Sequence, residues 1–336
     1  MTHNEAEGAS LIPPTPDSEA YWSVFGDEAV WLSAAAEVCR REGLDPGGPG
    51  RKARLSHYPV VMLPSGLVVK FFGPVEGGER AWASERRGLE LLARDPELPI
   101  PKIVADADLD EEWSYIVMTT LSGSLLREAA KSMATGGFVA VGRWLGRFVA
   151  RLRSLDLSPE ERAAGRDAYL PQTRWRHANV VRLLSDRDIL TPELREQIPA
   201  WLPPVDDLIG DPAAAVPVHG ELNAHHVLGR ANGDGFEPTG IIDFNTFRIG
   251  ETAQEIGMVW QGALGLDRPS FIAFLVEAGI DRHAPDFPTR TLASVMMQTP
   301  PTLRHIADLE AVSGLDELAA RAFGFEGEPL RVQQHG

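Results

Sequence analysis

One short segment, residues 218–244, places two carboxylates at the two ends of an expected hairpin. Glu221 stands near its start and Asp243 near its end, and apolar strands over 227–228 and 239–242 flank a turn rich in Gly, Asn and Asp. Because a hairpin returns its ends to one place, we expect the two carboxylates to act together. Such a pair suits phosphoryl transfer to a hydroxyl. One acid accepts a hydrogen bond from the hydroxyl, and the other holds metal ions that neutralise nucleotide phosphates.

The same segment resembles the catalytic motif of the aminoglycoside phosphotransferases, bacterial enzymes with a protein-kinase-like fold. Their pattern is HGDLxxxNVL followed by a strand that ends in IDF or IDW, and the matching residues here are His219, Gly220, Leu222, Val227, Leu228 and the run Ile242-Asp243-Phe244. Glu221 replaces the expected catalytic Asp, and His226 replaces the expected metal-binding Asn. The resemblance implies that Glu221 is the base or orienting acceptor. It also implies that Asp243 binds the metal ions, with His226 or Asn223 completing the shell.

Both replacements fall on residues that carry chemistry. Glu is one methylene longer than Asp and has a similar unperturbed pKa, so Glu221 can serve as the same acceptor after a small shift of the substrate or backbone. Mg²⁺ prefers oxygen ligands, whereas the imidazole of His226 suits softer ions such as Mn²⁺. We therefore expect Mg²⁺, with Mn²⁺ as the alternative ion. For His226 the alternative role is to brace the loop.

A kinase-like fold also needs a lysine on an N-terminal strand and a glutamate on the helix that follows it. Apolar strands over 59–63 and 67–72 predict a hairpin that carries Lys70 on its second strand. Residues 79–92 have apolar positions at helical spacing and include Glu85. Alone, a lysine on a strand is usually a solvated charge. Its order relative to Glu85 and the downstream motif predicts instead that Lys70 holds the α- and β-phosphates.

Two further stretches are weaker candidates for nucleotide contacts. Residues 54–59 occupy the place of a phosphate flap but are not glycine-rich, so Ser56 is either a phosphate contact or part of a plain strand connection. Residues 114–123 are expected to lead into the hinge between two lobes. The resemblance implies that this hinge, with Met118 and Thr120, contacts the nucleotide base through its main chain. Met118 is otherwise an ordinary core residue.

Within this family the chain is most similar to the hygromycin B phosphotransferase branch, in which a helix precedes the nucleotide lobe. The shared blocks are 69–73, 83–85, 115–118, 145–147, 201–206 and 218–220. The likeness extends over residues 21–323 and implies an α+β, two-lobed, protein-kinase-like fold with a small β-rich N-lobe and a large helical C-lobe. It implies ATP or GTP as the cofactor and does not identify the acceptor, because family members modify many small molecules.

Composition narrows the class of partner. The chain has 336 residues, of which 43% are hydrophobic, and a formal net charge of −16. This charge argues against nucleic acid, whose phosphates would be repelled, and favours a cationic acceptor. Glu251, Glu255 and Asp267 follow the expected metal-binding strand, where the family builds its acceptor cleft, and we predict that they contact the substrate. Acidic residues also serve solubility, which is the alternative for each of them.

The predicted organisation has three parts: a disordered lead over residues 1–18, an N-terminal helix and nucleotide lobe over 19–120, and a helical lobe with the catalytic hairpin over 121–330. No apolar run approaches the roughly 20 residues needed to span a bilayer, and no signal peptide is recognisable. The single cysteine, Cys39, fits a reducing cytoplasm and is predicted to be a packing residue. We expect a cytoplasmic monomer or homodimer.

These observations predict an ATP- or GTP-dependent O-phosphotransferase that acts on a small molecule, with an aminoglycoside or nucleoside antibiotic as the expected acceptor. Antibiotic self-resistance or biosynthesis is the expected setting. Two alternatives stay open. The first is a degenerate kinase fold that binds ligands or serves as a scaffold. The second is a biosynthetic kinase that acts on peptide side chains. Glu221 and His226 keep the first alternative open, and the second stays open because kinase-like folds have been adapted to that use.

Overall fold

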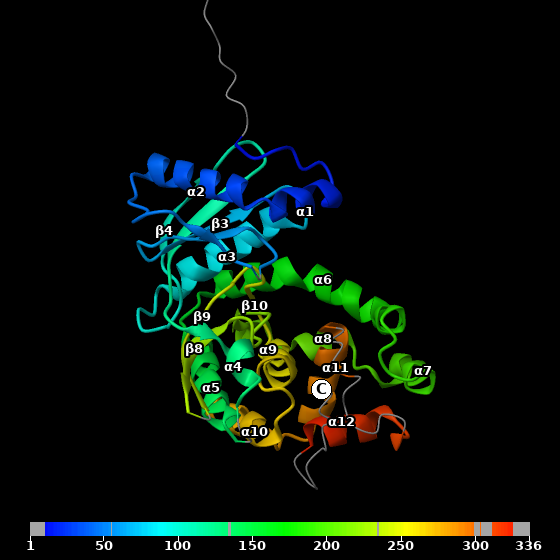
Figure 1. Ribbon diagram of the computed structural model, residues 1–336. Helices are drawn as coiled ribbons and strands as arrows, with labels where there is room; N and C mark the ends of the chain where they lie inside the picture. Colours follow the sequence, from blue (N-terminus) through cyan, green and yellow to red (C-terminus); the bar gives the residue numbers. More distant parts are fainter. Residues whose placement is uncertain are drawn as a thin grey trace, which may run out of the picture. The chain divides into compact units, whose positions relative to one another are not determined.

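The computed structural model describes residues 11–54, 56–133, 136–233, 235–298, 303 and 311–324. The chain forms two compact units. The first, here the sheet unit, comprises Met1–Ala93, Pro99–Leu121 and Asp243–Thr246. The second, the helical unit, comprises Arg94–Leu98, Ser122–Ile242 and Phe247–Gly336. Residues 1–10 of the predicted lead lie outside the described residues. The α+β fold class predicted from the sequence is confirmed by the small antiparallel sheet and the large helical part (Figure 1).

The sheet unit is built on five antiparallel strands in the order β1-β2-β3-β5-β4. Their bounds are β1 Arg51–Lys52, β2 Val60–Met62, β3 Leu67–Phe72, β4 Ile103–Asp108 and β5 Ser114–Thr119. The hairpin predicted around Lys70 is confirmed, because β2 and β3 pair with Val60 opposite Lys70. Since side chains alternate along a strand, Lys70 and its neighbour Phe71 point to opposite faces of the sheet.

Three helices accompany this sheet: α1 (Ser18–Gly26), α2 (Glu28–Glu42) and α3 (Gly78–Leu92). A buried cluster that includes Trp31 of α2, Phe71, Trp113 and Tyr115 fills the space between α2 and one sheet face. Helix α2 ends at Glu42. Gly43 follows it in the left-handed region, at φ 64°, a conformation that favours glycine. Lys70 is therefore left on the other face of the sheet, together with Phe72.

The helical unit contains two small sheets and most of the helices. The sheets pair β7 (Val216–Val218) with β10 (Arg248–Gly250), and β6 (Ser124–Leu125) with β8 (Val227–Asn232) and β9 (Gly235–Ile241). The helices are α4 (Leu126–Ala130), α5 (Phe138–Ser154), α6 (Pro159–Asp186), α7 (Pro192–Trp201), α8 (Val205–Ile209), α9 (Ala253–Met258), α10 (Arg268–Glu277), α11 (Phe287–Gln298) and α12 (Leu315–Phe323), with a π-helical turn at Val259–Ala263. The hairpin predicted over residues 227–242 is confirmed as β8 and β9, with a shorter turn than expected.

Helix α6 is a long helix of 28 residues. It begins with a capping box: the Ser158 hydroxyl accepts the Glu161 N–H at 3.2 Å, and the Glu161 carboxylate accepts the Ser158 N–H at 2.8 Å. The first half of α6 shows no regular apolar stripe, since its buried residues are only Gly165 and Tyr169. Periodicity therefore indicates only the second half, and the capping box locates the true start.

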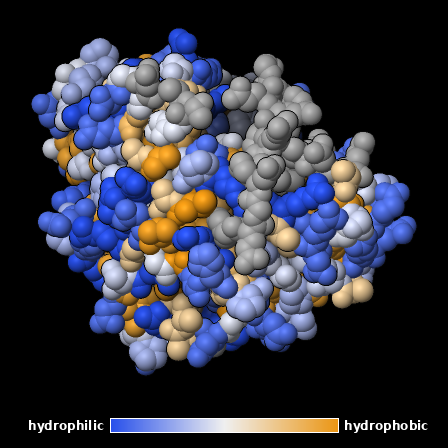
Figure 2. Space-filling model, turned by 90° about the horizontal axis from the view of Figure 1, so that it is seen from below, coloured by the Kyte–Doolittle hydropathy of each residue, from blue (hydrophilic) through white to orange (hydrophobic). Residues whose placement is uncertain are grey.

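Apolar side chains on the surface are scattered. Among the described residues, the large ones that remain exposed are Leu11, Trp22, Val104, Trp175, Val181 and Val276. The face seen in Figure 2 is mostly polar with small apolar groups between. Single apolar residues on a surface are normal and mark no site by themselves. Within the described ranges, no helix combines the length and apolarity that crossing a bilayer requires. Cys39 is buried in α2, as predicted.

Candidate active site

Lys70 is the centre of a buried ion-pair network in the sheet unit. Its ammonium donates to Glu85 Oε2 at 2.5 Å and to Asp243 Oδ1 at 2.6 Å. Glu85 comes from α3, and Asp243 returns to this unit from the end of the hairpin. Lys70 is 5% exposed and Glu85 1% exposed. The pairing of Lys70 with Glu85, predicted from their order in the sequence, is present, and Asp243 joins it.

The network keeps the lysine charged. Burial lowers the pKa of Lys70, but the carboxylates of Asp243 and Glu85 outweigh burial and raise the pKa above its ordinary value. Burial raises the pKa of Glu85, and Lys70 opposes this effect. The Phe244 backbone N–H also supports the charged form of Glu85. A protonated ammonium held by two carboxylates is a rigid cation that suits an anionic ligand such as a phosphate.

Asp243 has an unusual backbone. Its φ of 70° lies in the left-handed region, which non-glycine residues seldom adopt and which is often found at functional sites. Aspartate tolerates this conformation better than most residues. The conformation lets the chain turn away directly after the hairpin while its carboxylate reaches Lys70.

The loop that carries Glu221 lies in the helical unit and is held from within. His219 is fully buried and its Nδ1 accepts the Glu221 N–H at 3.3 Å, so its Nε2 carries the proton and donates to the Ile242 carbonyl at 3.0 Å. The Gly220 N–H donates to Glu255 Oε1 at 2.7 Å. Gly220 has φ 87°, where a side chain would be strained. Sequence and packing together thus fix the backbone on which Glu221 stands.

Glu255, one of the three predicted substrate contacts, is a buried residue of α9. It is 1% exposed and accepts the Gly220 N–H. Burial raises the pKa of its carboxyl, and the Gly220 N–H and Arg248 oppose that rise. In this structure it positions the loop from beneath. Its contact with a substrate stays a prediction that this burial does not support.

The side chains of Asn223 and His226 form hydrogen bonds within the loop. The Asn223 amide donates to Glu221 Oε1 at 3.5 Å, and its Oδ1 accepts the His225 N–H at 2.8 Å. His226 Nδ1 donates to the Glu221 carbonyl at 2.7 Å. This bond fixes the proton on Nδ1, so Nε2 is the ring nitrogen with ligand character. The bracing role considered for His226 is therefore present, and it is compatible with a ligand role for Nε2.

The predicted metal ligands are Asp243, His226 and Asn223. Among the described residues, no group of three or more His, Cys, Asp or Glu side chains is gathered as a metal site. Asp243 Oδ1 is bonded to Lys70, and Asn223 Oδ1 is bonded to the His225 N–H. Carboxylate and imidazole are suitable ligand types for Mg²⁺ and Mn²⁺ respectively. Metal binding by Asp243, His226 and Asn223 stays a prediction from the motif.

The remaining nucleotide candidates are in the sheet unit. The Ser56 hydroxyl donates to the Tyr58 carbonyl. Met118 is buried on β5, opposite Val68 of β3. The Thr120 N–H and hydroxyl both donate to the Gly66 carbonyl, at 2.9 and 3.1 Å. Contact with a base at Thr120 would therefore have to use its carbonyl.

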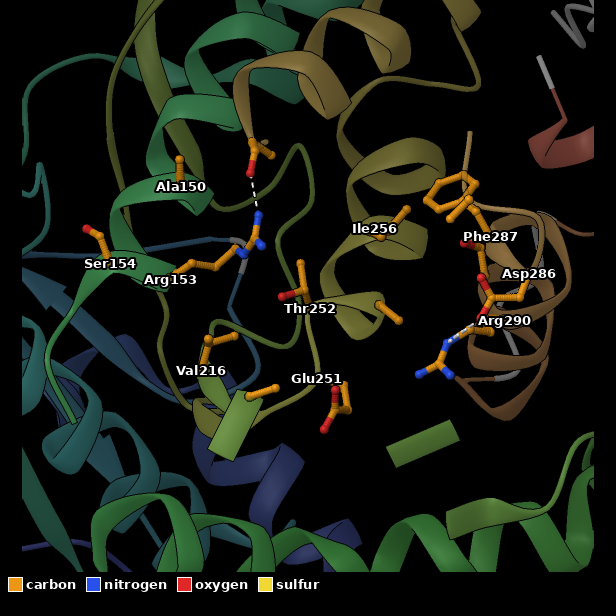
Figure 3. A pocket seen from close by; sticks show the side chains of 15 residues that line it. Ala150, Arg153, Ser154, Val216, Glu251, Thr252, Ile256, Asp286, Phe287 and Arg290 are labelled. Atoms are coloured by element: carbon orange, nitrogen blue, oxygen red, sulfur yellow. Dashed lines mark hydrogen bonds and ion pairs between the residues drawn. The ribbon is translucent and has the colours of Figure 1, made fainter. Parts of the chain in front are cut away.

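Glu251 lines a cavity of about 660 Å³ inside the helical unit, with residues of α5, α9 and α11 around it (Figure 3). Among the described residues, none hydrogen bonds to its carboxylate. Burial raises the pKa of Glu251 to about 7, although Arg290 and Arg166 oppose the rise. The residue follows β10, at the end of the β7–β10 ribbon away from His219, since Gly250 pairs with Val216 and Arg248 with Val218.

Asp267, the third acidic candidate, is the N-cap of α10. Its Oδ2 accepts the Ser270 N–H at 3.0 Å. This hydrogen bond satisfies a donor at the start of the helix. It explains the aspartate without a substrate, so its substrate role stays a prediction.

Two aromatic residues at the site were not predicted. The Lys70 ammonium lies 5.8 Å from the ring centroid of Tyr58 and 5.3 Å from that of Phe72. Phe72 is two residues from Lys70 on the same strand, so alternation would have placed it on the same face. No pattern in the sequence signals Tyr58, because its contact depends on how residues 54–59 fold.

Several solved structures share this fold. The GDP complex of wild-type aminoglycoside 2'-phosphotransferase-IIIa is similar with a TM-score of 0.55 and 13% identity, over 82% of this chain and 87% of that one. Aminoglycoside-3'-phosphotransferase of type VIII is similar with a TM-score of 0.53 and 17% identity, over 80% of this chain and 98% of that one. The ternary complex of streptomycin, ATP and APH(2'')-IIa is similar with a TM-score of 0.52 and 13% identity, over 88% of this chain and 93% of that one. The fold is thus that of the kinase-like aminoglycoside phosphotransferases.

The sequence identifies the family more directly. The sequence model described as the phosphotransferase enzyme family matches residues 63–291, which is more than half of the chain. The chain therefore belongs to the phosphotransferase enzyme family. The matched range includes Lys70, Glu85, Glu221 and Asp243.

Proposed function

We propose that this protein transfers the γ-phosphoryl group of ATP or GTP to a hydroxyl of a small molecule. The observation that carries the proposal is the buried contact of the Lys70 ammonium with Glu85 and Asp243, at 2.5 and 2.6 Å. This arrangement suits a triphosphate, because a fixed cation and a metal-binding carboxylate stand together. Membership of the phosphotransferase family supports the same chemistry.

The residues have distinct roles in this proposal. Lys70, held by Glu85, binds the α- and β-phosphates. Asp243 holds the metal ions, which neutralise charge on the phosphates when they are bound. Glu221 accepts the hydrogen bond of the acceptor hydroxyl and orients its oxygen. His219 and Glu255 keep the backbone of Glu221 in place through the contacts described above.

We infer a cationic acceptor, an aminoglycoside or a nucleoside antibiotic. The net charge of −16 supports a polycationic ligand through long-range attraction. Related folds were solved with such molecules, including one with streptomycin and one with kanamycin. Among the acidic candidates, Glu251 lines the cavity described above and is therefore a candidate contact for such a ligand. A closer kinship with hygromycin B phosphotransferase and a role in self-resistance or biosynthesis belong to the same proposal.

The experiment is a screen of labelled phosphate transfer from ATP and from GTP to a panel of aminoglycoside and nucleoside antibiotics, with Mg²⁺ and with Mn²⁺. The proposal expects labelled product with at least one acceptor. The matched control is Asp243→Asn, which keeps size and shape but removes the charge. Equal transfer by wild type and Asp243→Asn would refute the assigned roles.

A second candidate is a kinase-fold protein that binds a nucleotide or another ligand without transfer. The observation in its favour is that the described residues form no metal cluster, while Glu221 and His226 replace the motif's Asp and Asn. Ligand binding to the native state stabilises it by RT ln(1 + [L]/Kd), so a thermal-shift titration separates the two candidates. Stabilisation by nucleotide only with a divalent cation favours transfer, and stabilisation without one favours binding alone. A labelled peptide product in the transfer screen would instead identify a peptide side-chain kinase.

A further inference from the structure

Tyr58 and Phe72 form an aromatic wall beside the Lys70 ammonium. The Lys70 Nζ is 5.3 Å from the Phe72 ring centroid and 5.8 Å from that of Tyr58. The two rings lie 5.2 Å apart. Both aromatic residues are buried, Tyr58 being 5% exposed. These distances fall within the range in which an aromatic face attracts a cation.

The two rings compensate the Lys70 ammonium for the hydration that it loses on burial. An ammonium has three N–H donors, and Glu85 and Asp243 accept two of them. An aromatic ring attracts the cation through its quadrupole without accepting one of these N–H bonds in the ordinary geometry. The rings therefore compensate for lost hydration and leave the third donor to an incoming phosphate oxygen. A polar side chain at position 58 would compete for that donor.

Tyr58 is itself fixed by a chain of contacts. Its hydroxyl donates to the Glu76 carbonyl at 2.8 Å. The Glu76 carboxylate accepts a hydrogen bond from Ser18 at 2.7 Å and lies 3.7 Å from His57. Tyr21 of α1 donates to the His57 carbonyl at 3.0 Å. Helix α1 thus contacts both Glu76, which accepts the Tyr58 hydroxyl, and His57, which precedes Tyr58 in the chain.

We propose that Tyr58 is a positioning residue for phosphate binding: its ring holds the Lys70 ammonium in the geometry that leaves one N–H for the nucleotide, and α1 anchors the ring. This inference rests on the proposed function, since it assigns Lys70 to phosphates. Residues 56–58 stand where a glycine-rich flap is expected, and in this proposal the segment positions Lys70 through Tyr58. The Tyr58 ring acts on the lysine and does not itself need to contact the nucleotide.

The first test measures Lys70 directly and needs no nucleotide. Lys52, Lys70, Lys102 and Lys131 are the lysines of the chain, so amine acylation followed by mass spectrometry resolves each one. In wild type, Lys70 should react far more slowly than the exposed Lys102 and Lys131. Tyr58→Leu should increase the Lys70 rate relative to these two by roughly fivefold or more, the factor that about 1 kcal/mol of cation–π attraction represents.

The matched control is Tyr115→Leu. Tyr115 is also a buried tyrosine of the sheet unit, but it belongs to the cluster on the opposite sheet face. This variant should leave the relative rate of Lys70 unchanged. An unchanged Lys70 rate in Tyr58→Leu, or an equal rise in both variants, would overturn the proposal, because the effect would then be absent or a general loosening.

The second test separates this inference from the proposed function. Calorimetry should show that Tyr58→Leu weakens ADP binding roughly fivefold while adenosine binding is unchanged, because only the phosphates contact Lys70. Tyr58→Phe keeps the ring and loses the anchoring bond to Glu76, so its ADP affinity should lie between those of wild type and Tyr58→Leu. Equal weakening for ADP and adenosine would overturn the positioning role. If wild type binds neither ADP nor ATP, the proposed function fails, and the labelling result alone decides whether Tyr58 positions Lys70.

Discussion

Replacing Glu251 by Gln is expected to stabilise the protein at pH 8 but not at pH 4. Burial raises the pKa of Glu251 from 4.5 to about 7. The folded state therefore keeps this proton to a higher pH than the unfolded state does. Stability that is present below pH 4.5 is lost as pH rises toward 7, because the native carboxyl must then ionise in an unfavourable place. Glutamine removes that ionisation.

The size of the effect follows from the same two values. The interval between 4.5 and about 7, at about 1.4 kcal/mol for each pH unit, corresponds to roughly 3 kcal/mol. The cavity beside Glu251 lets water approach the carboxylate, which reduces this cost. We therefore expect Glu251→Gln to gain between about 1 and 3 kcal/mol of unfolding free energy at pH 8.

The assay is urea unfolding of both proteins at several pH values between 4 and 8. The control is Glu237→Gln, at an exposed glutamate on β9 of the same unit. The difference in unfolding free energy between Glu251→Gln and wild type should grow as pH rises from about 4.5 to 7. The same difference for Glu237→Gln should stay near zero. A constant gap, or one that closes with rising pH, would refute the argument.

Three further predictions concern Asp243, Glu221 and the residue that holds the Glu221 loop. Asp243→Asn should lower turnover by at least about 100-fold with little change in the circular dichroism spectrum. Glu221→Gln should lower turnover by a similar factor, because this variant loses the charge of the acceptor. Glu221→Asp should raise the rate if the longer side chain only displaces the carboxylate, and a strong loss of rate would show that the loop is built around glutamate. Glu255→Ala should cost about 1 to 3 kcal/mol of stability, measured by urea unfolding, because the Gly220 N–H loses its acceptor. Glu255→Gln keeps an acceptor oxygen and should be milder, so an equal loss in both would count against this role.

The sequence predicted those parts of the site that depend on order along the chain. Lys70 and Glu85 were paired because a strand and the next helix are neighbours in a kinase-like fold, and the hydrogen bond of 2.5 Å is present. The hairpin over residues 227–242 followed from local turn chemistry. The pairing and the hairpin both depend on residues that are near one another in the chain, so a single sequence is enough to predict them.

Long-range contacts account for most of what the sequence left open. The burial of Glu255 and its bond to Gly220 depend on where α9 packs, which no local pattern determines. Tyr58 faces Lys70 because Glu76 and α1 hold it there. Asp267 is different: an aspartate three residues before Ser270 and two before Pro269 is a local N-cap signal that the sequence itself contains.

The most direct test of the central claim is a calorimetric titration of wild type and Lys70→Met with ATP in the presence of Mg²⁺, with adenosine as the matched ligand. If Lys70 holds the phosphates, the variant should bind ATP at least about tenfold more weakly, since a charged hydrogen bond of about 1.4 kcal/mol or more is lost. Adenosine affinity should stay the same. Equal ATP affinity in the two proteins would contradict the account.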